Sequence, residues 1–304
     1  MNEIKSTFSI TICPKLHFDF EATVTTHGWL SLAPFIWNAE NAILSRVEQL
    51  NDGKLVRLNI SATGSTENPT LSIEIHSTSI INEGNKQEVA KLVTHILRLD
   101  EDFEEFYQLC TQQNGTWNDI KKGKGRLLRS PTVFEDLVKT ICTTNIQWGG
   151  TKRMAQELVD KYGQSFAENP TLKSFPKAED IVSDSFEEFT QKVNLGYRAD
   201  YIYQLAKNVS AGTINPEDFL DQQLSTIELK KKLLAIKGIG NYASATMLML
   251  LGRYDELPID SVFKDFVSGK YFNGKKYSEK KARNIYKKWG RWQYLAYWFD
   301  MEKS

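Results

Sequence analysis

Residues 225–263 read STIELKKKLLAIKGIGNYASATMLMLLGRYDELPIDSVF, and this stretch decides the fold. Ser225 and Glu228 have the spacing of a capping box, which predicts the start of a helix. Lysine-rich and apolar residues continue that helix until KGIG at 237–240 interrupts the helical period. Apolar residues then resume in a second helical run. The sequence therefore predicts a helix, a glycine hairpin and a second helix over residues 225–251.

The hairpin has the features of a phosphate-binding turn. Two glycines around one apolar residue allow a tight turn with positive φ angles, and they leave no side chain between the backbone amides and a ligand. A helix N-terminus with a partial positive charge follows, so phosphate oxygens are suitable ligands. A plain corner between two helices is the alternative. The capping box, the nearby lysines and the apolar anchor Ile239 favour phosphate binding, with Lys237 as a further phosphate contact.

Asp260 lies shortly after the hairpin and begins another helical run. Its position predicts an N-cap, which is the most common role of an aspartate at such a place. A cap is compatible with catalysis, because the helix fixes the carboxylate and favours its ionised form. These residues alone leave both roles of Asp260 open.

The composition limits the class of protein. With 304 residues and 41% hydrophobic content, the chain can form two or three packed units. It contains no apolar run of about 18 residues and no signal-peptide pattern at its start, so we expect a cytoplasmic or nuclear protein without a membrane partner. The three cysteines, Cys13, Cys110 and Cys142, are too few for an iron–sulfur cluster.

Charge and histidine are distributed unevenly along the chain. Residues 1–119 contain 8 basic and 16 acidic side chains, which leaves 30 basic and 22 acidic side chains for residues 120–304. A basic C-terminal part suits contact with phosphates, although solvated helix faces explain such a bias equally well. All four histidines precede residue 100, so chemistry in the later part must rely on carboxylate, lysine, tyrosine or cysteine.

Two structural classes follow one another along the sequence. Four runs that are β-branched or alternating predict strands: FSITI at 8–12, ATVTT at 22–26, LVRLNI at 55–60 and LSIEI at 71–75. WLSLAPFIW at 29–37 predicts either a helix or a buried segment. From about residue 87 the apolar period is helical, and no further strand is expected. We therefore predict an α+β fold with a small domain at 1–100 and a helical domain at 101–304.

Two further corners between helices carry polar and aromatic residues. The first contains TTNIQW at 143–148 and follows a helix that Ser130 and Pro131 are expected to begin. The second contains GYR at 196–198 and follows a helix predicted from the Ser185–Glu188 capping box. Each corner therefore presents planar or amide side chains at a helix junction.

Several of these segments resemble one family. The run from 233 to 263 resembles the helix-hairpin-helix DNA glycosylases, in which a Gly/Pro-rich loop and a catalytic aspartate follow the hairpin. ICTTNIQWGGTKRM at 141–154 and LGYRADYI at 195–202 resemble 8-oxoguanine glycosylases. HGWLSLAPFIWN at 27–38 and WGRWQYLAYWF at 289–299 are more similar to bacterial 3-methyladenine glycosylases of type II. The resemblance covers most of the chain, in the order of the family.

The resemblance implies a fold and a set of roles. The expected fold is a small N-terminal α+β domain of TBP-like type followed by a bilobal helical domain, with the active-site cleft between its lobes. Asp260 takes the position of the catalytic aspartate. We expect a monomer that contacts double-stranded DNA through the hairpin and the two corners. The residues implied in DNA contact are Asn145, Ile146, Tyr197, Arg198, Lys237, Gly238, Ile239 and Gly240.

Some of these positions have a more specific implied role. Asn145, together with Ile146, and Tyr197 match positions that fill the space of an extruded base. Flipping a base leaves a hole in the duplex that a planar or amide side chain can fill. Arg198 matches a position that contacts the opposite strand. Family members also bind a monovalent cation, K⁺ or Na⁺, through hairpin carbonyls that match Leu234, Ile236 and Ile239.

Two departures from the family pattern concern the reaction. Relatives that also cut the strand have a Schiff-base lysine two residues after the second hairpin glycine, where this chain has Tyr242. We therefore expect a glycosylase without lyase activity. The histidine that 8-oxoguanine enzymes place two residues after the aspartate is Val262 here, which argues against that substrate. Alkylated purines, such as 3-methyladenine, are the preferred expectation.

The expected reaction needs one carboxylate and aromatic stacking. Asp260 would stabilise the positive charge that develops on the deoxyribose and orient the attacking water. Tyr242, Tyr297 and Trp298 are candidates for stacking on the base, although packing in an apolar core explains Trp298 equally well. An 8-oxoguanine or other-lesion glycosylase is one alternative. A noncatalytic DNA-binding module that uses the hairpin as a phosphate grip is another.

Overall fold

The computed structural model describes residues 6–14, 17–113 and 117–302. The chain forms two compact units: Met1–Asp102 with Lys122–Pro216, and Phe103–Lys121 with Glu217–Ser304. One break of this division, between Asp102 and Phe103, lies near the expected boundary at residue 100, but the chain returns to the first unit at Lys122. The helices that follow Lys122 belong to the same unit as the N-terminal sheet. Each unit is described separately below.

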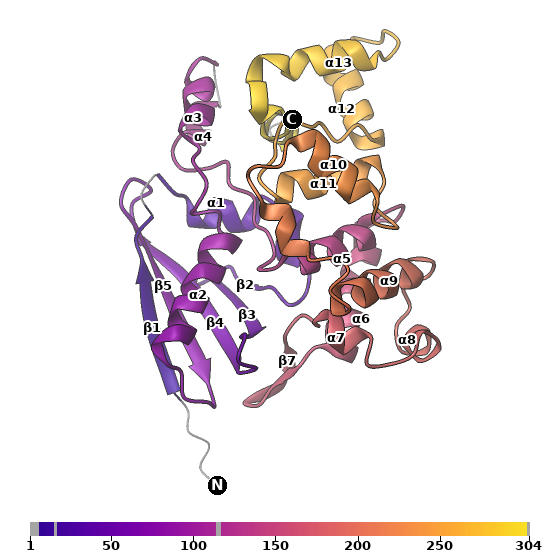
Figure 1. Ribbon diagram of the computed structural model, residues 1–304. Helices are drawn as coiled ribbons and strands as arrows, with labels where there is room; N and C mark the ends of the chain where they lie inside the picture. Colours follow the sequence, from indigo (N-terminus) through magenta and orange to yellow (C-terminus); the bar gives the residue numbers. More distant parts are fainter. Residues whose placement is uncertain (1–5, 15–16, 114–116, 303–304) are drawn as a thin grey trace. The chain divides into compact units, whose positions relative to one another are not determined.

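The first unit is built on a five-stranded antiparallel sheet with the strand order β1-β5-β4-β3-β2. Its strands are β1 (Ser6–Ile12), β2 (Ile36–Asn38), β3 (Ile43–Gln49), β4 (Leu55–Gly64) and β5 (Pro69–Ser77). Leu58, Ile60, Ile73 and Ile75 alternate with more polar residues and are fully buried on one face. Helix α2 (Glu83–Ile96) lies across the sheet and buries Val89, Val93 and Ile96 (Figure 1).

Three of the four predicted strands are confirmed, and the fourth is wrong. ATVTT forms most of helix α1 (Phe20–Thr25). Asp19 caps this helix, because its carboxylate accepts a hydrogen bond from the Ala22 amide at 2.9 Å. The cap and the burial of one helix face outweigh the β-propensity of the valine and threonines. The segment at 29–37 forms the 3₁₀ turn η1 (Gly28–Ser31) and part of β2.

Helices complete the first unit. They are α5 (Val133–Thr143), α6 (Trp148–Tyr162), α7 (Ala178–Ile181), α8 (Phe186–Lys192) and α9 (Arg198–Ser210). A short antiparallel hairpin, β6 (Ser165–Phe166) and β7 (Asn169–Lys173), follows α6. The expectation that no strand follows residue 87 is therefore wrong. The hairpin is too short to produce a visible alternation in the sequence.

The predicted start of α5 is displaced by two residues. Thr132, rather than Ser130, caps the helix, because its hydroxyl accepts a hydrogen bond from the Glu135 amide at 3.2 Å. The Ser130 amide instead donates to the buried Asp136 carboxylate at 3.0 Å. Pro131 therefore precedes the cap. The capping box of Ser185 that begins α8 is confirmed.

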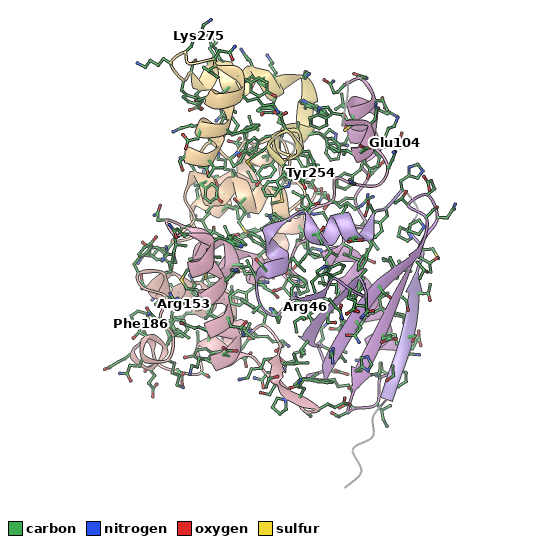
Figure 2. The ribbon with its side chains drawn as sticks, turned by 180° about the vertical axis from the view of Figure 1, so that it is seen from behind. Arg46, Glu104, Arg153, Phe186, Tyr254 and Lys275 are labelled. Atoms are coloured by element: carbon green, nitrogen blue, oxygen red, sulfur yellow. The ribbon has the colours of Figure 1, made fainter. Side chains whose placement is uncertain are left out.

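The second unit is helical throughout its described residues. Its elements are α3 (Glu104–Thr111), α4 (Trp117–Ile120), η2 (Pro216–Leu220), α10 (Thr226–Leu234), α11 (Asn241–Leu250), α12 (Ser261–Tyr271), α13 (Glu279–Tyr286), η3 (Lys287–Trp292) and α14 (Gln293–Glu302). Aromatic rings form much of its core, and the Tyr254 ring stacks on Trp292 at 5.3 Å (Figure 2). The Ser225 capping box and the helix-hairpin-helix at 225–251 are confirmed.

A fully buried charge cluster joins the sheet to α5 in the first unit. Arg46 of β3 donates to the Glu135 carboxylate at 2.9 Å and forms an ion pair with Glu48 (Figure 2). Lys139 of α5 donates to the same Glu135 carboxylate at 2.5 Å. Burial opposes the charge of Glu135, but Arg46 and Lys139 outweigh it and lower the pKa of Glu135. Burial raises the pKa of Glu48 to about 7. Removing one member would therefore leave other charges buried without a counter-charge.

We expect Glu135→Gln to destabilise the protein by about 3–5 kcal/mol, because it leaves Arg46 and Lys139 buried without a full counter-charge. The free energy of unfolding, measured by urea titration, checks this value. Glu83→Gln is the matched control: it removes an exposed partner of Lys86 in the same unit and should cost less than about 1 kcal/mol. Equal losses for the two variants would contradict the burial argument.

Candidate functional site

The hairpin between α10 and α11 exposes backbone at its turn. Gly238 has φ +93°, a left-handed conformation that glycine adopts without strain. Ile239 is buried and anchors the turn, and its amide donates to the Ile236 carbonyl at 3.0 Å. Gly240 then caps α11 and has no side chain to occupy the amides of the first helical turn. These amides therefore remain suited to an anion such as a phosphate.

Asp260 is the N-cap of α12. Its carboxylate accepts a hydrogen bond from the Phe263 amide at 2.8 Å, so the structural role predicted from the sequence is confirmed. The side chain is only partly exposed. Burial raises the pKa of Asp260, and the backbone hydrogen bond from Phe263 opposes this rise. The helix thus holds one carboxylate oxygen in place at a partly buried position.

Three tyrosines lie near enough to this carboxylate for its charge to affect their pKa values, and we refer to Tyr242, Tyr294 and Tyr297 as the tyrosine cage. Burial is the main cause that raises the pKa of each phenol, and the negative charge of Asp260 adds to the rise in all three. Tyr294 and Tyr297 are buried, whereas Tyr242 is 38% exposed. The charge of Asp260 therefore acts on all three phenols, and Tyr242 is the one that solvent reaches.

Of the three residues predicted to stack on the base, two lie in the tyrosine cage and one does not. Tyr242 and Tyr297 belong to the cage. Trp298 stacks on Tyr294, with ring centroids 6.5 Å apart, and so lies behind the cage. Tyr294 is missing from the sequence prediction. Its spacing of three residues from Tyr297 places both on one face of α14, and this spacing was the available signal.

A second carboxylate fixes the far end of α12. Asp300 of α14 accepts hydrogen bonds from Lys270 at 3.0 Å and from Tyr286 at 2.9 Å, and it also accepts one from Tyr271. Lys270 and Tyr271 are the last residues of α12. This cluster holds α12 against α14, and thereby sets the position of Asp260 relative to the tyrosine cage.

The two predicted corners of the first unit meet. Asn145 has φ +47°, and its side-chain amide donates to the Tyr197 hydroxyl at 3.3 Å. The guanidinium of Arg198 donates to the Thr144 carbonyl and lies over the Tyr197 ring. Ile146 is 37% and Tyr197 50% exposed, whereas Arg198 is only 5% exposed. In this conformation Arg198 holds the corner from inside, and Asn145, Ile146 and Tyr197 form its surface.

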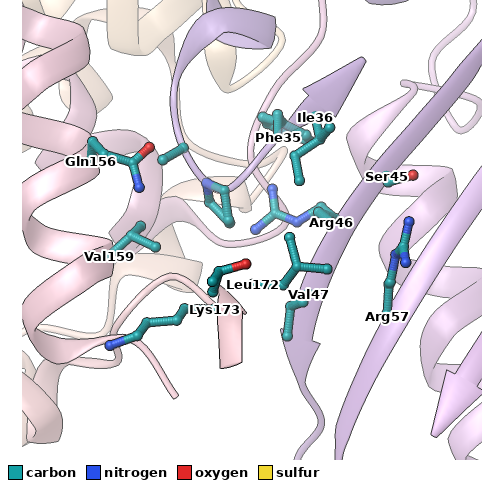
Figure 3. A pocket seen from close by; sticks show the side chains of 13 residues that line it. Phe35, Ile36, Ser45, Arg46, Val47, Arg57, Gln156, Val159, Leu172 and Lys173 are labelled. Carbon is teal, nitrogen blue, oxygen red and sulfur yellow. The ribbon is translucent and has the colours of Figure 1, made fainter. Parts of the chain in front are cut away.

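A pocket of about 80 Å³ that is open to solvent lies elsewhere in the first unit (Figure 3). Pro34, Arg46, Val47 and Leu172 are among its lining residues, and the described lining includes none of the residues predicted from the sequence. The pocket therefore lies apart from the residues that the sequence predicts for DNA contact and catalysis.

Within the described residues, no group of three or more His, Cys, Asp or Glu side chains comes together to hold a metal ion. No described helix combines the length and apolar character needed to cross a bilayer.

Solved structures share this architecture over nearly the whole chain. The 3-methyladenine DNA-glycosylase from Archaeoglobus fulgidus is 22% identical with a TM-score of 0.75, and the match covers 97% of this chain and 98% of that chain. The 8-oxoguanine glycosylase/lyase of Clostridium acetobutylicum in its apo-form is 19% identical with a TM-score of 0.69, and the match covers 97% of both chains. The same enzyme in complex with dsDNA containing cytosine opposite 8-oxoG is 18% identical, with a TM-score of 0.65 and 99% and 98% covered. These likenesses show the fold.

The sequence comparisons identify the family. A search of curated proteins finds no match. A family model described as "HhH-GPD superfamily base excision DNA repair protein" matches residues 138–291, which include the helix-hairpin-helix and Asp260. This match spans half of the chain and agrees with the fold of the solved structures. The chain therefore belongs to the HhH-GPD superfamily of base excision DNA repair proteins.

Proposed function

We propose that this protein is a monofunctional DNA glycosylase that removes alkylated purines, with Asp260 as its catalytic carboxylate. The observation that carries the proposal is the placement of the partly buried Asp260 carboxylate at the N-terminus of α12, where the Phe263 amide holds it at 2.8 Å. A noncatalytic phosphate grip would need the hairpin but would gain nothing from a carboxylate whose charge burial disfavours. The cost of burying that charge is therefore better explained by chemistry.

The proposed reaction breaks the bond between C1′ of the deoxyribose and the base nitrogen. The bonding electrons leave with the base, and positive charge develops on the sugar. Ionised Asp260 stabilises this charge and orients a water molecule, whose oxygen forms the new bond to C1′. The water loses a proton to the solvent. The products are the free base and an abasic site.

The tyrosine cage supports an alkylated purine as the substrate. Alkylation on a ring nitrogen gives the purine a positive charge, so the base leaves as a neutral molecule and needs no general acid. All four histidines lie before residue 100, and this agrees with a reaction that depends on a carboxylate. Aromatic faces also attract a cation, at about 0.5–2 kcal/mol for each contact. Tyr242 is the cage residue accessible for such stacking.

DNA contact is proposed for both units. The exposed backbone of Gly238 and Gly240, with the adjoining Lys237, would bind phosphate oxygens without reading bases. Asn145, Ile146 and Tyr197 would enter the duplex where the base has left it. The protein would act as a monomer on double-stranded DNA.

A monovalent cation is a further part of the proposal. The carbonyls of Leu234, Ile236 and Ile239 lie in a turn whose closing bond runs from the Ile239 amide to the Ile236 carbonyl. Each carbonyl oxygen has two lone pairs, so this bond leaves capacity for a cation. A bound K⁺ or Na⁺ would add positive charge beside the phosphate. The amides of α11 would still orient that phosphate.

We expect Asp260→Asn to lower excision by at least about 10²–10³-fold, because it removes the charge that stabilises the transition state. The asparagine oxygen can still accept from the Phe263 amide, so the helix cap and DNA affinity should persist. Duplexes with 3-methyladenine, 7-methylguanine, hypoxanthine, uracil or 8-oxoguanine are incubated with protein, and half of each reaction is treated with hot alkali.

Wild-type protein should give strand breaks only after alkali, and only with alkylated purines. Strand breaks without alkali would show lyase activity. They would overturn the inference that Tyr242, in place of a Schiff-base lysine, makes the enzyme monofunctional. Preference for 8-oxoguanine or uracil would overturn the substrate class. Equal rates for Asp260→Asn and wild-type protein would remove Asp260 from the chemistry.

The excision rate should fall as the pH is lowered. Asp260 acts as the anion, and burial raises the pKa of this group above its ordinary value. The active form is therefore present above that raised pKa and is lost as the pH falls through it. Single-turnover rates between mildly acidic and neutral pH test this, with DNA affinity followed over the same range. A flat profile in which binding and excision are both unchanged would contradict the role of the anion.

The ring of Tyr242 should matter more than its hydroxyl. We expect Tyr242→Leu to reduce excision of a cationic purine by about 2–30-fold, which corresponds to the loss of one cation–π contact. Tyr242→Phe keeps the ring and should remain close to the wild-type rate. Single-turnover rates with 7-methylguanine measure the difference. If Tyr242→Phe and Tyr242→Leu lower the excision rate equally, the substrate depends on the hydroxyl of Tyr242 and not on stacking against its ring.

A further inference from the structure

We infer that the N-terminal turn η1 positions Asn145 and Ile146 for entry into DNA, and that it acts through Trp148. We refer to residues 145–147 as the inserting corner. The inference rests on the proposed function, because it assumes that Asn145 and Ile146 enter the duplex. It assigns to the N-terminal α+β part of the chain a role in base extrusion. Its residues Gly28 and Ser31 are positioning residues and do not touch the reacting atoms.

The contact between η1 and Trp148 is specific in both geometry and chemistry. The indole Nε1 of Trp148 donates to the Ser31 hydroxyl oxygen at 3.0 Å, and that hydroxyl donates to the Gly28 carbonyl at 2.9 Å. The indole ring lies directly against Gly28, where an added Cβ would be 2.7 Å from a ring carbon. Position 28 therefore admits only glycine unless the indole moves. The serine and the glycine together fix the plane of the ring.

Trp148 is the first residue of α6 and directly follows Asn145, Ile146 and Gln147 of the inserting corner. Within the described residues, the preceding Gln147 makes no side-chain capping bond to this helix. The direction of α6 at its start therefore depends on contacts from outside, and Trp148 supplies one of them. Ile146 folds over Gly150 in the same first turn, since a Cβ there would be 2.3 Å from the end of the Ile146 side chain. A shift of the indole would therefore be passed on to Ile146.

The turn η1 is itself held rigidly to α5. Trp29 is buried, and its indole N–H donates to the Asp136 carboxylate at 2.7 Å. The His27 ring stacks on Trp29 at 4.7 Å and forms a hydrogen bond with the Leu128 carbonyl at 3.1 Å. Burial lowers the pKa of His27 to about 4, so the ring is neutral at neutral pH and stacks as an uncharged group. The end of α5 leads directly into the corner.

The corner is thus held on both sides. On the N-terminal side of Asn145, Arg198 and Tyr197 donate hydrogen bonds to the Thr144 carbonyl. On its C-terminal side, Trp148 donates a hydrogen bond to Ser31 of η1. Between these two supports lies Asn145, in a left-handed conformation that asparagine adopts more readily than most non-glycine residues. A residue held between two external supports has a defined direction before DNA arrives. This preparation reduces the ordering cost of insertion.

The exposure of these groups argues against a purely structural role. Trp148 is 39% exposed, and Ser31 is also exposed, so this is a surface contact rather than part of the core. A hydrogen bond of this kind contributes about 0.5–1.5 kcal/mol to stability. Its loss should therefore affect the orientation of the corner far more than the folding of the protein.

The test is a double-mutant cycle on base extrusion. Ser31→Ala and Trp148→Phe each remove the same hydrogen bond, and stopped-flow fluorescence of 2-aminopurine, placed opposite a stable abasic-site analogue in a duplex, reports extrusion. We expect each variant to slow extrusion by about 3–10-fold, in line with one hydrogen bond. The double variant should be no slower than either single one. Ser31→Thr keeps the hydroxyl and should restore the wild-type rate.

Two controls separate orientation from stability. Ser183→Ala removes an exposed serine hydroxyl of the same unit that donates to the Asp180 carbonyl, and it should leave extrusion unchanged. Gly28→Ala displaces the indole without removing a polar group, and it should slow extrusion at least as much as Ser31→Ala. The midpoint of thermal unfolding is measured for every variant. Loss of extrusion that follows only the loss of stability would overturn the inference.

The outcomes also separate this inference from the proposed function. Excision of alkylated purines by wild-type protein, with no effect of Ser31→Ala on extrusion, would overturn the positioning role alone. Extrusion that depends on Ser31, without excision of any lesion, would overturn the glycosylase proposal and keep the positioning role. Additive effects of Ser31→Ala and Trp148→Phe would show that the two residues act separately, which also contradicts the inference.

Discussion

The hydrogen bond from the Phe263 amide to the Asp260 carboxylate is the constraint that fixes the start of α12 and the position of Asp260 in the second unit. Burial disfavours the charged form of this carboxylate, while a helix N-terminus favours it. Because burial raises the pKa in the folded state, the charge at neutral pH reduces the stability of the fold, and stability is regained as the pH falls. The unit therefore carries an energetic cost at this residue. The cluster around Asp300, at the other end of α12, helps to keep the helix in place despite that cost.

Local patterns made the hairpin and the cap of α12 predictable. The Ser225 capping box, the two hairpin glycines and Asp260 act within a few residues of one another, so their geometry follows from short-range rules. Strand β3 was not predictable in this way. Arg46 and Glu48 occupy its buried face, and they remove the apolar alternation that marks a strand. Their partner Glu135 is 89 residues away from Arg46 in the chain, and no local rule connects them.

In the candidate site, too, the residues of short motifs were predictable and the residues brought in by long-range packing were not. The family resemblance pointed to Asp260 and to the two corners, because these are short motifs. Tyr294 and Asp300 stand in an aromatic helix whose sequence is typical of an ordinary core, and only the packing of α12 against α14 relates them to the Asp260 carboxylate. Arg198 illustrates a different limit. Its position in the motif suggests an exposed contact, but its guanidinium lies inside and holds the Thr144 carbonyl.

The buried ion cluster between β3 and α5 makes the N-terminal sheet inseparable from the helices of its unit. Arg46 comes from the sheet, whereas Glu135 and Lys139 come from the helix that ends at the corner containing Asn145. A shortened chain that began after the sheet would expose the apolar face of α5 and take away one of the two cations that neutralise Glu135. Replacing the N-terminal sheet by the sheet of another protein would fail for the same reason, because the new sheet would need an arginine at the position of Arg46. The sheet and α5 are therefore constrained to change together, as parts of one body rather than as a catalytic core with an accessory domain.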